Sequence, residues 1–280
     1  ELQLTGEKNP RNYSNLFPSA HFTYSVSPDN SYQLSYSRRV RRPTYNDLSP
    51  FVTFSDNRNF FSGNPNLNPQ FTESFDLGNV HYYDKGSISS SLYYRYTTGK
   101  IERIRTVDAN GYSKTLPQNI ADEESMGAEV TGSKNMNRIW KADLNLNFFR
   151  AKINASNINQ NFTAETFSWF VRHTSRLKIA QKIDVQIRAN YEAPQKTAQG
   201  TRGNIAWVDL SATKDVMQGK GTLSLNVLDV FNSRIMRTET NGGTFYTNRE
   251  MQGRLRQINI TFNYRFNTTK QAAKQRRSMM

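Results

Sequence analysis

The stretch WKADLNLNF, Trp140–Phe148, alternates apolar and polar residues without interruption. Residues two apart in a β-strand lie on the same face of its sheet, so one face of this segment is apolar and the other is polar. The same period of two returns at Ile183–Tyr191 and Ile258–Phe266, and again around Ile88–Tyr96. Apolar residues do not recur at helical spacing over any long segment. The sequence therefore predicts an all-β protein.

Weaker versions of the pattern raise the expected number of strands to about eleven, and residues 1–6 resemble the tail of one more. The weaker segments are Ala20–Val26, Tyr32–Tyr36, Phe71–Leu77, Met126–Gly132, Phe167–Ile179, Ala206–Ala212 and Leu223–Val227. Each strand is expected to have roughly ten residues or more, which is the length that a tilted strand needs to cross a bilayer.

The connections between these strands alternate strictly between short and long. The short ones are Ser27–Asn30, Asp84–Gly86, Lys134–Arg138, the region of Gln181–Lys182, and Met217–Gly221. The long ones are Gly6–Leu16, Arg38–Gln70, Asp108–Ala121, Lys152–Thr163, Glu192–Arg202 and Asn232–Arg249. Outer-membrane barrels have short periplasmic turns and long extracellular loops. The alternation therefore predicts an antiparallel transmembrane β-barrel with extracellular long loops and a periplasmic C-terminus.

The composition is compatible with this prediction and excludes several others. Hydrophobic residues make up 36% of the chain and the mean hydropathy is −0.76, so helical membrane spans are excluded. Mean hydropathy does not reveal a barrel strand, because only every second residue of such a strand faces lipid. The chain has no cysteine, which excludes disulfides and thiolate metal sites. Its net charge of +14 is spread over strands and loops rather than gathered in one stripe, so nucleic acid is not an expected partner.

Several short segments resemble the barrel region of TonB-dependent receptors, and in particular the outer-membrane β-barrel receptors of Bacteroidetes-type bacteria. They are NYSNLFPS (Asn12–Ser19), SRRVRRPTYNDLSP (Ser37–Pro50), GNPNLNP (Gly63–Pro69), SMGAEVT (Ser125–Thr131), LNVLDVFN (Leu225–Asn232) and RQINITFNYRF (Arg256–Phe266). The likeness extends from about Tyr13 to Phe266. GNPNLNP and the final segment are fairly specific together, whereas each alone is weak.

The resemblance implies a 22-stranded barrel with an N-terminal plug domain, driven by TonB, that imports a ligand too large or scarce for porins. On that basis we expect residues 1–266 to be about the C-terminal half of one such barrel. Neither a plug nor a TonB-contacting segment lies in this chain, and no secretory signal opens it, so we expect a mature form or a fragment. Residues 267–280 depart from the family's aromatic ending, and we expect a basic, mobile tail.

Two groups of residues at the longest loop are candidates for ligand binding. The basic group, Arg38, Arg39, Arg41 and Arg42, could grip lipopolysaccharide phosphates or an anionic ligand, or could be solvated charge at a strand end. The aromatic group could stack on sugars or other planar ligands, or could pack the loop against its neighbours. It contains Tyr45, Phe51, Phe54, Phe60 and Phe61.

Catalytic and metal-binding patterns do not emerge from the sequence. His21, His81 and His173 are far apart, and the acidic run at 122–124 is typical of a solvated segment. There is no G-x-S-x-G segment, phosphate-binding glycine loop or paired-carboxylate pattern. We therefore expect no catalytic residue, no metal and no cofactor, and a protein that is not an enzyme.

The leading hypothesis is an outer-membrane receptor barrel for TonB-dependent uptake. Its expected partners are outer-membrane lipid and lipopolysaccharide, the TonB system through a plug outside this chain, and an unidentified ligand. A passive porin or an adhesion barrel is one alternative, and a soluble basic β-protein that binds polysaccharide or nucleic acid is another. The alternation of loop lengths has no explanation in a soluble protein.

Overall fold

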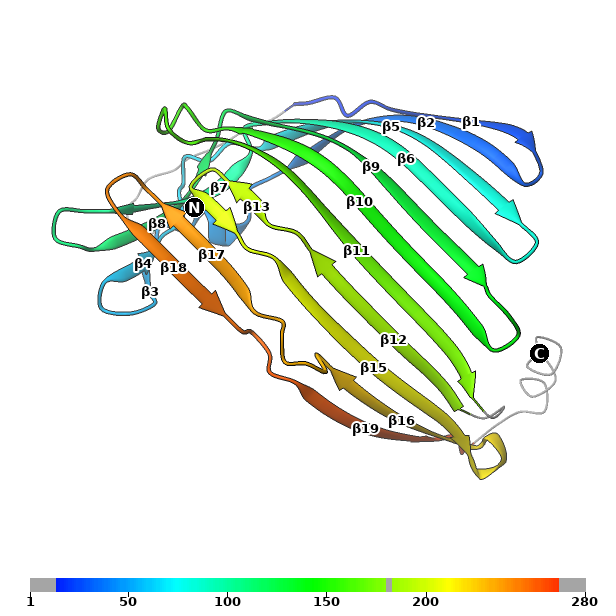
Figure 1. The fold of residues 1–280 in the computed structure, drawn as a ribbon. Helices are drawn as coiled ribbons and strands as arrows, with labels where there is room; N and C mark the ends of the chain where they lie inside the picture. The colour runs from blue at the N-terminus through cyan, green and yellow to red at the C-terminus, as the bar shows by residue number, and fades with distance from the viewer. Residues whose placement is uncertain (1–13, 180–182, 267–280) are drawn as a thin grey trace.

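Eleven long strands form one antiparallel sheet in the computed structural model, in which residues 14–179 and 183–266 are described (Figure 1). Each strand pairs with the next of the eleven along the chain. The strands are β1 (Ser19–Ser27), β2 (Asn30–Arg41), β5 (Gln70–Tyr83), β6 (Gly86–Thr98), β9 (Asp122–Asn135), β10 (Trp140–Asn154), β11 (Thr163–Ile179), β12 (Ile183–Glu192), β15 (Ile205–Val216), β16 (Gly221–Leu228) and β19 (Gln257–Tyr264). The predicted all-β fold and the number of strands are thus confirmed.

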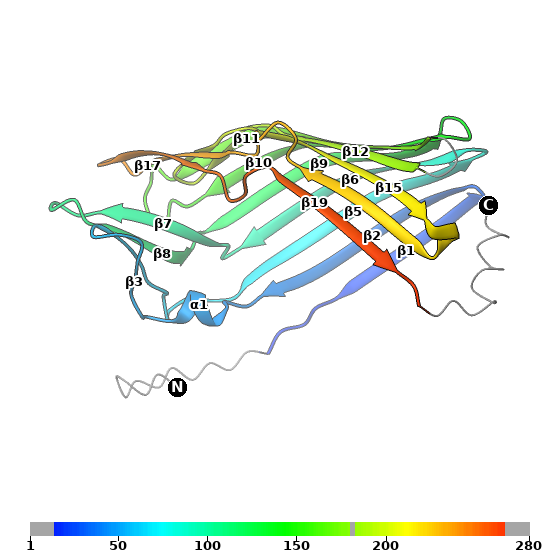
Figure 2. The ribbon, with the colours of Figure 1, turned by 90° about the horizontal axis from the view of Figure 1, so that it is seen from below.

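Two four-stranded sheets lie at the end of the main sheet that carries the long connections (Figures 1 and 2). One contains β3 (Thr53–Phe54), β4 (Asn59–Phe61), β8 (Ser113–Asn119) and β7 (Ile101–Val107), and the other contains β13 (Gln195–Thr197), β14 (Gly200–Arg202), β17 (Met236–Asn241) and β18 (Tyr246–Met251). A one-turn helix, α1 (Tyr45–Leu48), precedes β3, and a short 3₁₀ turn, η1 (Met217–Gly219), joins β15 to β16. No helix in the described part of the chain is long and apolar enough to cross a membrane.

The alternation of connections is present, but the predicted loop boundaries were partly wrong. Strand β2 continues through Arg41, so Arg38 and Arg39 belong to a strand rather than to the longest loop. The predicted loops Asp108–Ala121 and Asn232–Arg249 contain strands β8, β17 and β18. Backbone hydrogen bonds within and between the long loops form these additional strands. The period-two pattern of the membrane strands does not predict them. The expected strand tail at the start of the chain, the short connection expected around Gln181–Lys182 and the basic tail expected at 267–280 lie outside the described residues.

The strand register separates an apolar face from a polar face. Directly paired residues of antiparallel strands lie on the same face, and one row runs through Phe22, Leu34, Leu77, Leu92, Ala128, Phe148 and Trp169. The neighbouring positions on the other face are polar, as in Asn145, Asn147 and Ser168. We refer to the face that carries Leu144 as the outward face and to the face that carries Asn145 as the inward face.

Charged side chains on the outward face occur only near the two ends of the eleven described strands. At the loop end they are Arg38, Glu73, Asp122, Glu124, Arg150, Lys152 and Glu165, and at the turn end they are Lys134 and Lys214. On β10 the uncharged outward positions run from Trp140 to Phe148, about 27 Å along the strand at about 3.4 Å per residue. Such a band, crossed by tilted strands, fits the apolar girdle of an outer-membrane barrel.

The main sheet is curved (Figure 2), and its inward face is crowded, since Tyr93, Asn147 and Ser168 are buried there. Tyr93 is buried and its hydroxyl donates to Asn147 Oδ1, 3.2 Å away, across the intervening strand β9. Gly127 on that strand leaves the required space, because a Cβ there would lie 2.5 Å from the Tyr93 hydroxyl oxygen and 2.6 Å from the Phe148 carbonyl oxygen. The tyrosine therefore covers the gap that a glycine leaves in the wall.

Strands β1 and β19 are the outermost strands of the main sheet, and each has one hydrogen-bonded neighbour among the described residues. The sheet is therefore open along both strands. Part of a larger barrel would form an open sheet of this kind, because a complete barrel closes by pairing its first and last strands. The total of 22 strands remains a prediction.

Candidate functional site

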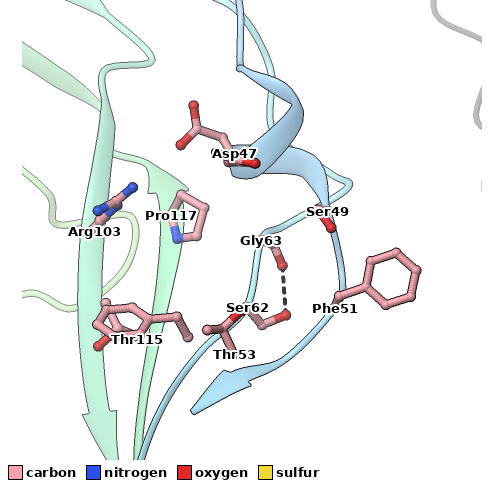
Figure 3. Close-up of a pocket in the computed structure, with 11 residues that line it drawn as sticks. Asp47, Ser49, Phe51, Thr53, Ser62, Gly63, Arg103, Thr115 and Pro117 are labelled. Atoms are coloured by element: carbon pink, nitrogen blue, oxygen red, sulfur yellow. Dashed lines mark hydrogen bonds between the residues drawn. The ribbon is translucent and has the colours of Figure 1, made fainter. Parts of the chain in front are cut away.

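The loop end of the sheet contains a cavity of about 400 Å³ between α1, β3, β4, β7 and β8 (Figure 3). Its lining combines two phenyl rings, hydroxyl and amide groups, and one charge of each sign. The lining residues are Asn46, Asp47, Ser49, Phe51, Thr53, Phe61, Ser62, Gly63, Arg103, Thr115 and Pro117. An open, mixed polar and apolar cavity held by loops on a rigid sheet is a typical place for ligand recognition.

Helix α1 brings Asp47 to this cavity through a local capping arrangement. The Thr44 hydroxyl donates to Asp47 Oδ2 at 2.7 Å, and the Thr44 backbone N–H donates to the same oxygen at 3.0 Å. The hydrogen bond from the Thr44 side chain is the main reason that the pKa of Asp47 lies below its ordinary value. Burial opposes this shift, whereas the positive charges of Arg41 and Arg103 add to it. Asp47 is thus a buried carboxylate that shapes the cavity wall.

The GNPNLNP segment holds the other side of the cavity. The Gly63 N–H donates to Ser49 O and the Asn64 N–H donates to Asp47 O, each at 2.7 Å. A Cβ on Gly63 would lie 2.3 Å from Ser49 O, so a larger residue cannot make this approach. The Asn64 side chain also donates to Pro117 O at 3.1 Å. This segment of the receptor-like sequence is therefore a brace that joins two loops.

The predicted basic group is divided by the alternation of strand β2. Arg38 lies on the outward face, where its guanidinium stands over the Phe71 ring at 5.4 Å. Arg39 and Arg41 lie on the inward face of the same strand, and Arg42 follows the strand end. The four side chains thus do not form one cluster, although each remains near the loop end.

The predicted aromatic group is also divided. Phe51 and Phe61 line the cavity, whereas Phe54 and Phe60 contact each other elsewhere, with ring centroids 6.1 Å apart. Tyr45 on α1 is 77% exposed and is not among the lining residues. Two of the five rings are therefore placed for contact with a ligand in the cavity. The binding roles of both predicted groups remain predictions.

Sequence reasoning missed Asp47, Arg103, Thr115 and Pro117. The T-x-x-D spacing of Thr44 and Asp47 is a helix-capping pattern that the sequence does contain. The other three come from β7 and β8, in which Arg103 pairs directly with Pro117 and Arg105 with Thr115. They reach the cavity because β8 pairs in parallel with β4, where Phe61 is the partner of Thr115. No local sequence pattern predicts this long-range pairing of β4 with β8.

Buried contacts tie the loops to one another and to the sheet. Lys100, between β6 and β7, lies 2.6 Å from Glu102 and 2.5 Å from Glu123. Burial disfavours the charged form of Lys100, but these two carboxylates outweigh it and raise the lysine's pKa above its ordinary value. The Gln199 side chain bridges the backbone N–H and carbonyl of Arg105, each at 2.8 Å. The loops are thus interlocked rather than independent.

A small hydrophobic core supports the same loop assembly. Ile104 from β7, Ile153 from β10 and Phe162 from the β10–β11 connection are buried together with Ile120 and Ala155.

The LDVFN segment forms a second local structure directly after β16. There, the Asp229 side chain accepts hydrogen bonds from the backbone N–H groups of Ser233 and Arg234. Asn232 accepts from the Arg256 N–H at 2.9 Å, which connects β16 with the start of β19. This second receptor-like segment is therefore a structural corner.

The inward face carries charges of both signs in partial pairs. Arg176 contacts Asp143 on this face, and Glu192 on this face lies 2.9 Å from Arg202 of the loop strand β14. Lys141, Arg95, Asp184 and Arg188 also lie on this face by register, as the alternation predicted. Among the described residues, no group of three His, Asp or Glu side chains could hold a metal ion.

The chain belongs to the outer membrane protein beta-barrel family, whose model matches residues 1–264. Membership places it in the outer membrane and excludes the soluble alternative. A comparison with curated protein sequences found no match.

Solved structures with the same fold include two receptors and a transporter. The siderophore receptor PirA from Pseudomonas aeruginosa is 13% identical, with a TM-score of 0.58 over 79% of this chain and 39% of its own. The ferric yersiniabactin uptake receptor FyuA from Yersinia pestis is 14% identical, with a TM-score of 0.61 over 88% and 36%. The copper transporter OprC is 16% identical, with a TM-score of 0.60 over 88% and 39%.

At these identities the likeness shows a common fold. The matched region covers about two fifths of the length of each solved structure. The more specific resemblance to Bacteroidetes-type receptors remains a prediction.

Proposed function

We propose that this chain is the C-terminal part of the barrel of a ligand-importing outer-membrane receptor, completed by further strands and a plug domain and driven by TonB. The long loops face the cell exterior, and the loop assembly recognises the ligand. The protein does not act as an enzyme, because the wall and loops provide passage and recognition rather than a reacting group.

The observation that carries this proposal is the interlocked loop assembly on one end of the sheet. A passive pore requires only that its loops leave the mouth of the barrel open. Here the connections form two further sheets, a buried core and a cavity, held by contacts such as Gln199 with Arg105. Ordered loops of this kind hold a binding site in a fixed geometry before the ligand arrives, which reduces the entropic cost of binding.

The fold of the similar structures supports the same class of function. Their names describe a siderophore receptor, a ferric yersiniabactin uptake receptor and a copper transporter. These are ligands for import rather than substrates for chemistry. For this chain we propose import without assigning the ligand, since the cavity beside Phe51, Phe61 and Arg103 suits several classes of compound.

A passive porin or an adhesion barrel is the competing function, and conductance separates the classes. We expect the full-length protein, reconstituted in a planar lipid bilayer, to show no steady open channel because a plug fills the lumen. A stable, ohmic conductance of porin size would support the passive alternative and contradict the proposal.

A second experiment tests recognition by the loop assembly. Uptake of ⁵⁵Fe-enterobactin, ⁵⁵Fe-yersiniabactin and ⁶⁴Cu is measured in cells with and without the full-length receptor. For any probe that the receptor imports, F61A and R103Q should lower uptake at limiting concentration, whereas F54A should not. Uptake that continues after TonB is removed would contradict the proposed energy source.

A further inference from the structure

Hydrogen-bond donors gather on the inward face below the loop assembly, near the loop end of β12 and β15. Direct pairing places Arg172, Asn190 and Trp207 in one row across β11, β12 and β15. Arg234, which follows the corner after β16, lies over the Trp207 ring, with its guanidinium carbon 4.5 Å from the ring centroid. We refer to these four residues, together with Arg188 on β12 and Arg202 on β14, as the lumen cluster.

Aromatic rings hold two arginines of the lumen cluster in place. The guanidinium of Arg172 lies over the Phe170 ring at 4.4 Å, in the same way that Arg234 lies over Trp207. Such stacking covers the flat face of a guanidinium and leaves the N–H groups at its edge free to donate. Both arginines are thus oriented before a ligand arrives, which lowers the entropic cost of binding.

The positive charge of the lumen cluster exceeds the negative charge beside it. Glu192 lies 2.9 Å from Arg202 and 3.8 Å from Arg172, so one carboxylate serves two arginines. Asp209, the register partner of Arg188, accepts a hydrogen bond from a backbone N–H instead. Among residues 14–179 and 183–266, Arg188 has no ion-pair partner. The cluster therefore favours a bound anion.

Buried donors without acceptors lie beside these charges. Asn190 is only 7% exposed, and its Nδ2 is buried without a hydrogen-bond acceptor in the described part of the chain. The buried Nε of Arg202 likewise has no acceptor among the described residues. Leaving such groups unpaired costs free energy, and native proteins therefore usually provide an acceptor. An oxygen-rich molecule bound to this wall would supply one.

We propose that the lumen cluster binds a carboxylate or phosphate group of the imported ligand as the ligand passes from the loop assembly into the barrel. Guanidinium groups form charge-assisted, bidentate hydrogen bonds with both kinds of oxyanion. The register places Arg172 on one side of Asn190, and Trp207 with Arg234 on the other. The amide of Asn190 then donates from the wall between the two arginines. The inference rests on the proposed function and names the chemistry that the ligand carries.

Isothermal titration calorimetry on the full-length protein in detergent tests this inference with three probes. Citrate presents carboxylates, pyrophosphate presents phosphates, and sucrose is the neutral control. We expect one or both anions to bind and sucrose not to bind. The variant R172Q/R234Q should bind the anion about tenfold more weakly, as is typical for the loss of charge-assisted contacts. Asn190→Asp keeps the size of the side chain but adds a negative charge at the centre of the cluster, so it should weaken binding by a similar factor. Heat-modifiable mobility on gels verifies that each variant is folded.

The matched control is R95Q/R176Q, which removes two inward-face arginines that already have carboxylate partners, Asp76 at 4.0 Å and Asp143. It should leave the anion affinity within about twofold, because those charges are already compensated. Equal losses in both double variants would show general attraction to a basic wall. Unchanged affinity in R172Q/R234Q, or no anion binding by the wild type, would show that the cluster is not an anion site, as when a plug carboxylate already fills it. Any of these results overturns the inference, as does equal binding of sucrose. TonB-dependent import by the wild type in intact cells would in each case leave the proposed function in place.

Discussion

The assignment of outward and inward faces makes a strong prediction at two neighbouring residues of β10. Leu144 is 40% exposed on the outward face. On that face of β10 it lies three positions before Arg150 and two positions after Trp140, so it is well within the uncharged band. An arginine near the bilayer midplane costs about 2–4 kcal/mol. Leu144→Arg should therefore lower the folding equilibrium constant about 30- to 700-fold, since each 1.4 kcal/mol is a factor of ten.

Asn145→Arg is the matched substitution on the inward face. Asn145 donates to Glu129 Oε1 at 2.7 Å and to Thr131 Oγ1 at 2.8 Å, and both bonds would be lost. The new guanidinium would remain in water and could pair with Glu129, so we expect a net cost below about 1 kcal/mol.

The assay is a denaturant titration of the full-length protein, folded into lipid vesicles and followed by tryptophan fluorescence. Phe148→Arg, next to the charged end of the band, should cost only about 0–1 kcal/mol, because the penalty falls towards the interface. Equal losses at Leu144 and Asn145, or a larger loss at Phe148 than at Leu144, would refute the assignment of the faces.

Three further predictions follow from other parts of the structure. Protease added to intact cells should cut the full-length protein within residues 42–69 and spare the turn at 84–86, and the opposite pattern would reverse the proposed topology. Gly127→Val should displace Tyr93 from Asn147 and lower the denaturation midpoint, whereas Gly132→Val, where a Cβ meets open space, should be tolerated; equal losses would show that the tyrosine cover is unimportant. The pKa of Asp47 is depressed, so its stabilising effect on α1 is present above the ordinary carboxyl pKa of about 3.8 and is lost as pH falls through the lower folded value. The hydrogen-exchange protection factor of residues 44–49, which corrects for the intrinsic pH dependence of amide exchange, should fall over that range in the wild type, and Asp47→Asn should abolish that fall.

The period-two pattern was sufficient to predict the wall of the barrel. Alternation in segments such as Trp140–Phe148 is a local property of a strand with lipid on one side and water on the other. Any register that placed Asn145 and Asn147 towards lipid would expose polar groups to hydrocarbon, so the two faces follow from the sequence. The strict alternation of short and long connections likewise predicted which ends of the strands lie together.

The loop assembly was decided by tertiary structure alone. Arg103 and Phe61 meet at one cavity because β4 and β8, far apart in the chain, pair in parallel. Arg38 and Arg39, adjacent in the sequence, are separated because β2 extends through Arg41 and places successive side chains on opposite faces. The period-two pattern indicates the environment of a single strand. A loop cavity depends on pairing between segments that are distant in the chain, and no repeating sequence pattern indicates such pairing. The sequence by itself therefore determined the membrane wall, and only the tertiary structure determined which residues meet above it.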